Sequence, residues 1–123
     1  MGTTYADLKL TNPFTNQSVS VRALVDTGAT HMIVPPEVAK ALGFDLEEAV
    51  VSDVTIADGR RLPVPRIRPV QITFADRSCM VDVVVLGDQC LMGFIPLECM
   101  DLIVDPLEER LIGAHAEGPV FRA

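Results

Sequence analysis

An aspartate stands directly after an apolar stretch and directly before a tight turn near residue 26 of this chain. Ala23-Leu24-Val25 is typical of the end of a strand, and Asp26-Thr27-Gly28-Ala29-Thr30 follows it. Gly28 permits close approach of the backbone, whose N–H groups can hydrogen-bond a carboxylate in such a turn. Asp26 is therefore the candidate for acid–base chemistry. The alternative is an Asx-type turn that only ends a strand.

A second pattern occurs about 65 residues further on, where Leu91-Met92-Gly93 combines two bulky apolar residues with a glycine. A short helical segment and another strand are predicted to follow it. Between the two patterns lies a predicted hairpin whose tip is Asp58-Gly59, the strongest hairpin signal in the chain. The chain therefore contains three features in a fixed order. A strand ending in an aspartate comes first, then a hairpin, and then an apolar-apolar-Gly segment.

This arrangement resembles the retropepsin-like family, the single-domain aspartic proteases of the retroviral type. The resemblance extends over nearly the whole chain, and its specific parts are Asp-Thr-Gly-Ala and Leu-Met-Gly. It implies that Asp26 is the catalytic aspartate. It also implies that Thr27 hydrogen-bonds its symmetry mate and that Gly28 supplies backbone contacts to the substrate.

The same resemblance implies where a peptide substrate would bind. Gly59, beside Asp58, would lie at the tip of a flap that closes over the peptide. Leu24 and Leu91 would form walls of apolar pockets, and Gly93 would let its strand pass close to the catalytic loop. The substrate-binding residues expected from it are Leu24, Ala29, Thr30, Asp58, Gly59, Leu91 and Gly93.

Hydrolysis by this mechanism needs two carboxylates, one ionised to activate water and one protonated to polarise the carbonyl group. Two carboxylates about 3 Å apart cannot both ionise, so they share a proton. The chain contains a single Asp-Thr-Gly and no Asp-Ser-Gly. We therefore expect an active enzyme to be a C2 homodimer in which one Asp26 from each chain meets on the axis. The expected substrate is a peptide or protein, with no cofactor and no metal.

Three positions depart from common patterns in related enzymes. Ala29 lacks the hydroxyl group that pepsin-like enzymes have there, which predicts an activity optimum at a higher pH than theirs. Phe94 and Thr30 stand where retroviral enzymes commonly have an arginine and an aspartate. The paired loss predicts a repacked corner, because either charge alone would be buried without a partner. His31 follows the turn, either near a substrate pocket or simply at the surface.

Composition points to one acidic domain, residues 1–123. Hydrophobic residues make up 49% of it, which is sufficient for a core, and the net charge is −7. This charge disfavours nucleic acid as a partner. Neither a signal peptide nor an apolar run long enough for a membrane span occurs, so a cytoplasmic location without membrane contact is expected. The odd set Cys79, Cys90 and Cys99 suggests buried thiols in a reducing compartment, with a Cys–His nucleophile as the alternative.

Turn signals about every ten residues predict an all-β fold of short strands. The resemblance to the retropepsin-like family implies that these strands form a closed barrel with one or two short helices. One helix is predicted over 37–42, opened by Pro35-Pro36 and ended at Gly43, and a short turn or helical piece over 96–100. Strands are predicted over 5–11, 18–25, 50–57, 62–65, 68–74, 80–86, 91–94, 102–104 and 110–112. The prolines in 62–65 mark an edge strand.

Two other functions are compatible with these features. A protein of the same fold could bind peptides or dimerise without cleaving. The discriminating variant is Asp26→Asn, which should abolish cleavage but leave peptide binding nearly intact. An unrelated small β-barrel would use Asp-Thr-Gly only as a turn. In that case we expect a monomer that Asp26→Asn hardly changes.

Overall fold

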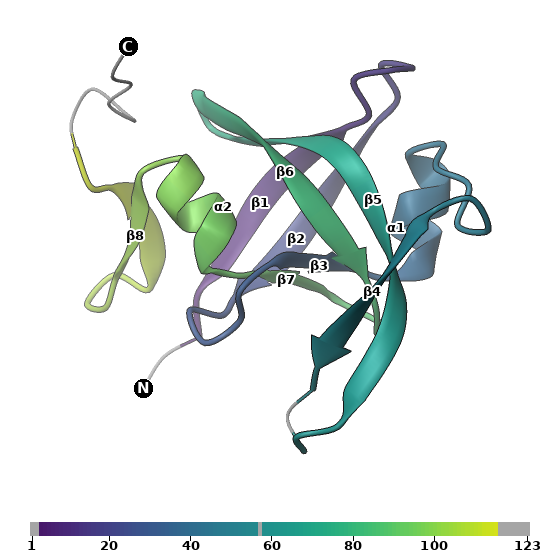
Figure 1. Ribbon diagram of the computed structural model, residues 1–123. Coiled ribbons are helices and arrows are strands. Elements are labelled where there is room, and N and C mark those ends of the chain that lie inside the picture. The colour runs from purple at the N-terminus through teal and green to yellow at the C-terminus, as the bar shows by residue number, and fades with distance from the viewer. Residues whose placement is uncertain (1–2, 57, 116–123) are drawn as a thin grey trace, which may run out of the picture.

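The structure, a computed structural model, describes residues 3–56 and 58–115. Figure 1 shows its elements, which follow in the order β1 (Tyr5–Thr11), β2 (Ser18–Val25), β3 (Met32–Val34), α1 (Pro36–Ala41), β4 (Val50–Thr55), β5 (Arg61–Phe74), β6 (Arg77–Val85), β7 (Cys90–Met92), α2 (Phe94–Cys99), β8 (Leu102–Asp105) and β9 (Arg110–Gly113). In this part of the chain, neither helix is long and apolar enough to cross a membrane.

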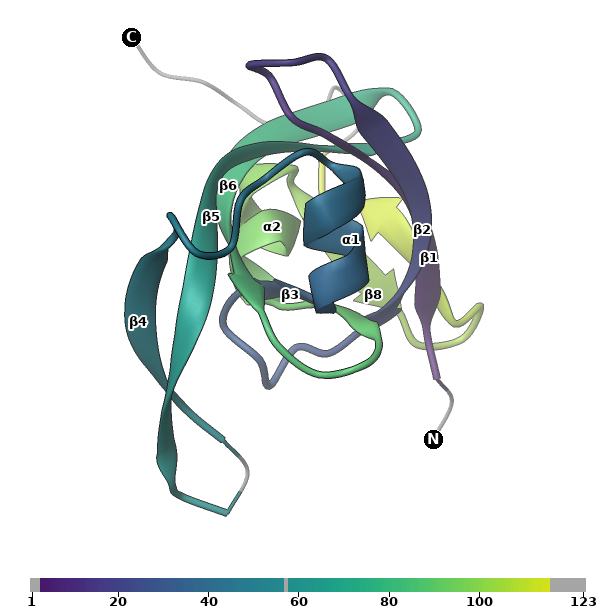
Figure 2. The same ribbon diagram turned by 90° about the vertical axis from the view of Figure 1, so that its right-hand side faces the viewer.

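Most strands belong to one curled sheet. Its strand order is β1-β2-β7-β3-β6-β5-β4, and β1 also pairs with β5. That extra pairing closes six strands into a barrel and leaves β4 outside, where it extends with the first half of β5 as a long hairpin (Figure 2). β8 and β9 form a separate two-stranded sheet. The predicted fold class, an all-β closed barrel with two short helices, is confirmed.

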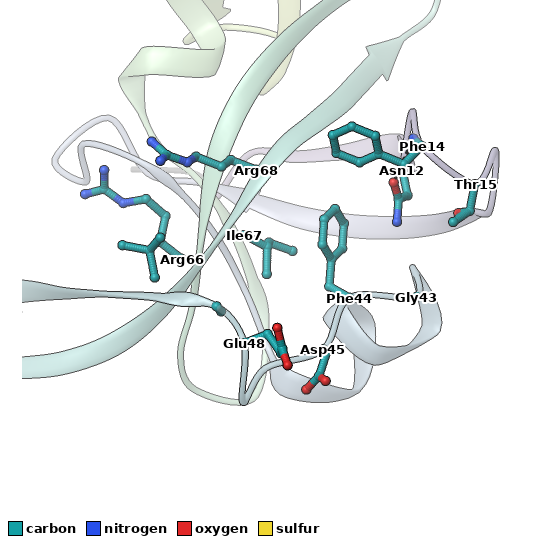
Figure 3. Close-up of a pocket in the computed structure, with 12 residues that line it drawn as sticks. Asn12, Phe14, Thr15, Gly43, Phe44, Asp45, Glu48, Arg66, Ile67 and Arg68 are labelled. Carbon is teal, nitrogen blue, oxygen red and sulfur yellow. Dashed lines mark hydrogen bonds between the residues drawn. The ribbon is translucent and has the colours of Figure 1, made fainter.

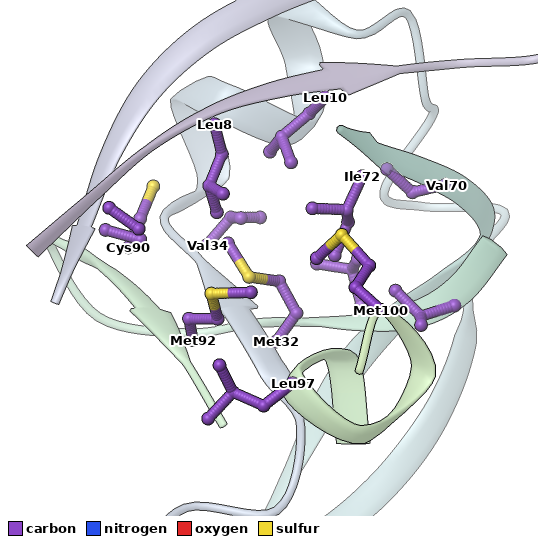
Figure 4. Packing of buried hydrophobic residues seen from close by; sticks show 14 of the residues in the cluster. Leu8, Leu10, Met32, Val34, Val70, Ile72, Cys90, Met92, Leu97 and Met100 are labelled. Carbon is purple, nitrogen blue, oxygen red and sulfur yellow. The ribbon is translucent and has the colours of Figure 1, made fainter. Parts of the chain in front are cut away.

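The barrel is filled by side chains that alternate along the strands. In β1, Ala6, Leu8 and Leu10 are buried while the residues between them are exposed. This period of two is what a strand with one face on the core requires. Figure 4 shows the centre of the core, where Met32 of β3, Met92 of β7 and Met100 after α2 come together.

The first helix is organised by the residues that the sequence analysis singled out. Pro35 precedes α1 in an extended conformation, and Pro36 occupies the first helical position, where a missing N–H costs nothing. Gly43 follows the helix with φ +85°, a conformation that glycine adopts without strain. The helix begins and ends one residue earlier than predicted.

Two predictions about the strands were wrong in detail. The segments predicted as two strands over 62–65 and 68–74 form the single strand β5, which bends at a register shift between Ile67 and Val70. Its first part, 61–65, pairs with β4 along one edge and with no strand along the other. The prolines in this part therefore interrupt no hydrogen bonds along the unpaired edge. The three-residue β3 was not predicted, because a strand so short shows no clear alternation.

Candidate active site

The backbone around Asp26 is fixed by two neighbouring strands. The N–H of Val25 donates to Thr4 O at 2.8 Å, and the N–H of Asp26 donates to Met92 O at 3.0 Å. These bonds continue the pairing of β2 with β1 and β7 up to the aspartate itself. Asp26 is therefore the first residue beyond a rigid strand, and its side chain is exposed on the surface of the protomer.

The turn after Asp26 orients its carboxylate. The N–H of Gly28 donates to Asp26 Oδ1 at 3.0 Å, and the N–H of Ala29 donates to the main-chain oxygen of Asp26 at 3.1 Å. A Cβ at position 28 would lie 3.3 Å from Asp26 Oδ1, closer than most such contacts. Glycine thus allows the N–H of residue 28 to reach the carboxylate without crowding.

Gly93 lies directly behind this turn. Its N–H donates to His31 O at 3.1 Å, and the next two N–H groups, of Phe94 and Ile95, donate to Ala29 O and Thr30 O, each at 3.0 Å. A Cβ at position 93 would lie 2.5 Å from His31 O, a separation that rigid backbone cannot accommodate. The start of α2 therefore clamps the loop over 29–31, and this close approach requires glycine at 93.

An apolar strip crosses the sheet on the face opposite to the core. Leu24 pairs with Leu91, Leu91 with Ile33, and Ile33 with Val84, so these four side chains share a face. Leu24 and Asp26 are two residues apart, a spacing that directs both side chains to this same face. The structure thus brings the predicted Leu24 and Leu91 together beside Asp26.

Sequence reasoning missed two members of this strip, Ile33 and Val84. Both belong to runs of consecutive apolar residues, Met32-Ile33-Val34 and Val83-Val84-Val85. Such runs do not reveal which side chain faces the core. Only the register of β3 on β6 shows that Ile33 and Val84 lie on the face of Leu91, while Met32 and Val83 enter the core.

The remaining predicted residues lie at two places. Thr27 and Thr30 are exposed in the Asp26 loop. Asp58 and Gly59 lie at the tip of the β4–β5 hairpin, where Gly59 has φ +88° and its N–H donates to Ile56 O at 2.9 Å. The structure does not bring this tip into contact with Asp26. The hairpin nevertheless projects from the same end of the barrel as the Asp26 loop (Figures 1 and 2).

The environments of two cysteines are unfavourable for a nucleophile. Burial raises the pKa of the Cys79 thiol, and the neighbouring Cys99 raises it further. Burial also raises the pKa of Cys90, with a smaller contribution from Glu37. Since the thiolate is the reactive form, these environments disfavour the Cys–His alternative. Within 3–56 and 58–115, no group of three or more histidine, cysteine, aspartate or glutamate side chains is arranged to hold a metal ion.

A family model described as aspartyl protease matches residues 13–100. The match spans more than half of the chain and includes the Asp26 loop, the β4–β5 hairpin and Gly93. The chain belongs to the aspartyl protease family. No match was found among curated proteins.

The fold of this family member is similar to two solved structures. The retropepsin-like aspartic protease from Rickettsia conorii is 21% identical, with a TM-score of 0.59 over 85% of this chain and 88% of that chain. The retroviral protease-like domain of Ddi1 from Leishmania major is 20% identical, with a TM-score of 0.59 over 97% of this chain and 95% of that domain. The resemblance to the retropepsin-like family is confirmed at the level of the fold.

In this chain the corner expected to carry an arginine and an aspartate is held by its backbone. Phe94 and Thr30 supply no charges, but the N–H of Phe94 and the carbonyl oxygen of Thr30 both take part in the hydrogen bonds between α2 and the Asp26 loop. An ion pair is not needed to join these segments. Because the arginine and the aspartate are both missing, no unpaired charge is buried at this corner.

Proposed function

We propose that this protein is an aspartic endopeptidase, active as a C2 homodimer. The observation that carries the proposal is the exposed Asp26 carboxylate on a loop that β1, β7 and α2 hold in place. Among the described residues, the one hydrogen bond to this carboxylate comes from Gly28. A second Asp26 from a partner chain would supply the other carboxylate that the chemistry needs.

In the proposed reaction one Asp26 is ionised and the other is protonated. The ionised carboxylate takes a proton from water as the water oxygen attacks the carbonyl carbon of the peptide, and the protonated one donates to the carbonyl oxygen. A tetrahedral diol forms. When its C–N bond breaks, the leaving nitrogen receives a proton and the diol becomes a carboxylic acid. No bond between enzyme and substrate forms at any step.

The small β8–β9 sheet supports the proposed dimer. A two-stranded sheet has two unpaired edges and is only marginally stable alone. Ile103 is 49% exposed and Leu107 is 91% exposed, although both are large and apolar. Symmetry-related hairpins could pair edge to edge and cover these side chains, and Leu111-Ile112 of β9 would then lie in the seam.

The free thiols support a reducing compartment such as the cytoplasm. Cys79, Cys90 and Cys99 are all free, and none of them is exposed. Free cysteines persist where disulfide formation is suppressed.

The experiment that tests the function measures casein cleavage from pH 3 to 7, with the oligomeric mass determined on the same samples. Asp26→Asn should lower cleavage by roughly 10²- to 10⁴-fold while the circular dichroism spectrum stays unchanged, because the substitution stands in both chains and leaves the dimer with neither carboxylate to move a proton. Wild type with pepstatin, a transition-state mimic, is measured in the same assay.

A dimer whose cleavage is lost in Asp26→Asn would support the proposal. A folded dimer that cleaves neither casein nor a randomised peptide library would contradict it and favour a module that only binds peptides. A stable monomer without cleavage would contradict the dimeric enzyme. An optimum near pH 2 would contradict the prediction drawn from Ala29.

A further inference from the structure

A pocket of about 410 Å³ lies where the β1–β2 turn, the segment after α1 and the start of the β4–β5 hairpin meet. No residue of the Asp26 loop lines it. Figure 3 shows Phe14 and Phe44 on one side of this pocket and Ile67 between them and the arginines. Its walls are mainly apolar, formed by Phe14, Phe44, Ala49, Val50 and Ile67.

One buried asparagine holds the two segments that carry the phenylalanines. Asn12 is 3% exposed; its Oδ1 accepts the N–H of Phe14 at 3.0 Å, and its Nδ2 donates to Leu42 O at 2.8 Å. Phe14 is nevertheless 76% exposed. Phe14 lines one apolar surface with the half-buried Phe44 and the exposed Val50. Such a contiguous surface is typical of binding sites, and its anchored turn needs little ordering when a partner binds.

Charges of opposite sign line opposite sides of the pocket. Arg68 and Arg66 lie on β5, whereas Asp45 and Glu48 lie on the segment between α1 and β4 (Figure 3). Arg66 contacts Asp82 at 3.5 Å but leaves its Nε without a hydrogen-bond partner, and Arg68 forms no ion pair within the described ranges. A ligand that complements this pattern carries an acidic group on one side of an apolar group and a basic group on the other.

The pocket continues into an unpaired strand edge. β4 pairs only with β5, so its other edge offers free backbone N–H and C=O groups. Val50, the first residue of β4, lines the pocket and is 51% exposed. The six residues of β4 span about 20 Å, enough to pair with an extended peptide of similar length.

We propose that this pocket and the free edge of β4 form a second peptide-binding site, separate from Asp26. Its ligand is an extended peptide segment with a large apolar side chain. That side chain enters the pocket and packs against Phe14 and Phe44. An acidic side chain of the same segment contacts Arg68, and a basic one contacts Glu48. Binding does not depend on catalysis. If the protein is the proposed endopeptidase, this site also selects which proteins it cleaves; that role rests on the proposed function.

The direct test uses the Asp26→Asn protein, so that no probe is cleaved, and measures fluorescence polarisation of fluorescein-labelled peptides. Two probes, Lys-Thr-Phe-Thr-Glu-Thr-Val and Glu-Thr-Phe-Thr-Lys-Thr-Val, present the charges in the two possible orders. Two further probes are the same peptides with serine in place of phenylalanine. We expect one order to bind and its serine version to bind at least tenfold more weakly. Phe14→Ser should weaken binding to a similar extent, whereas Met80→Ser, which removes an exposed apolar side chain of β6, should not.

A charge exchange tests the assigned contact of Arg68. Arg68→Glu should weaken binding of the preferred peptide, and replacing the glutamate of that peptide by lysine should restore it. The proposal would be overturned if Phe14→Ser and Arg68→Glu left binding unchanged. It would also be overturned if the serine peptides bound as tightly as the phenylalanine peptides, or if no probe bound. These results do not depend on whether the wild type cleaves anything.

The consequence for catalysis is measured separately on the wild type. A substrate that carries the preferred segment should have a KM about tenfold lower than one without it, with kcat unchanged, and Phe14→Ser should remove the difference. If the labelled peptides bind and no substrate is cleaved, the endopeptidase function fails while the binding site stands. If the KM values are equal, the binding site does not select substrates.

Discussion

Main-chain atoms of a neighbouring loop, and not side chains, leave no room for a Cβ atom at Gly93. The nearest atoms to an added Cβ are His31 O, Ala29 O and the carbonyl carbon of Thr30, all within 2.7 Å. They belong to the loop that carries Asp26, and they are held there by the hydrogen bonds from the start of α2. Any side chain at 93 therefore displaces the loop that positions the proposed catalytic group.

Gly93→Ala should consequently lower both stability and any activity. We expect a loss of about 1–3 kcal/mol in the free energy of unfolding, typical of overpacking, measured by urea denaturation. The control is Gly87→Asn, because position 87 has open space around it and asparagine tolerates its φ of +78°. Equal stability of Gly93→Ala and the wild type would contradict the described clamp.

The environment of Cys79 predicts a pH dependence of stability. Burial, and then the neighbouring Cys99, raise the pKa of this thiol above its ordinary value of 9.0. The unfolded chain therefore loses a proton above pH 9 that the folded chain keeps, and folding becomes less favourable as the pH rises further. The slope is at most about 1.4 kcal/mol per pH unit, and smaller because the thiol is partly exposed to solvent.

Urea denaturation at pH 8 and pH 10 measures this effect, with Cys79→Ala as the comparison. The two proteins differ only in residue 79, so the change in their stability difference reports on the thiol of Cys79. Wild type should be more stable at pH 8 because of packing, and its advantage should shrink at pH 10. An advantage that stays constant between the two pH values would contradict the predicted protonation of Cys79.

At the scale of the elements, one arginine joins the β8–β9 sheet to the barrel. Arg77, the first residue of β6, is 12% exposed in its side chain. Its Nη1 donates to Met100 O at 2.9 Å and to Asp101 O at 2.6 Å, and its Nη2 donates to His115 O at 2.7 Å. The planar guanidinium group thus connects the end of α2 with the chain just after β9.

Arg77→Lys keeps the charge but cannot reproduce these divergent hydrogen bonds. We expect the free energy of unfolding to fall by about 2 kcal/mol, because carbonyl groups lose charged donors. Hydrogen exchange of the β8 and β9 amides should accelerate more than that of β1. The matched control is Arg110→Lys on the exposed side of β9. Similar behaviour of both variants would show that Arg77 does not anchor this sheet.

At the scale of the whole molecule, the proposed dimer must overcome repulsion between two acidic chains. Each chain carries a net charge of −7. The approach of like charges is screened by salt, whereas burial of apolar surface is not weakened by it. We therefore infer that the seam relies on apolar contacts and strand pairing, of the kind that the β8–β9 sheet offers through Ile103 and Leu107.

Ile103→Asp should weaken the dimer at least tenfold without unfolding the protomer, since it places a charge at the proposed seam. Analytical ultracentrifugation gives the dissociation constant, and specific activity as a function of protein concentration should shift by the same factor. Activity per dimer should recover at high concentration. Met80→Asp, which changes an exposed residue of β6, is the control. An unchanged dissociation constant would exclude this sheet from the seam.

Local features of this chain were predictable because a few neighbouring residues decide them. β1 and β2 follow from alternation and match the predicted ranges, and α1 follows from Pro35-Pro36 and Gly43. The Asp26 turn follows from the same kind of local chemistry, since its hydrogen bond joins residues two positions apart. The candidate catalytic residue was therefore visible before the fold.

Long-range pairing was decided only by the tertiary structure. Pro63, Pro65 and Pro69 suggest a break in the strand, yet β5 continues through them because one side of 61–65 is unpaired and a register shift accommodates the rest. The strip through Ile33 and Val84 exists only because β3 inserts between β6 and β7. Which carboxylate is presented, and how its turn holds it, could be predicted without the fold, since both depend on adjacent residues. Which side chains surround it depended on the register between strands far apart in the chain, which only closure of the barrel sets.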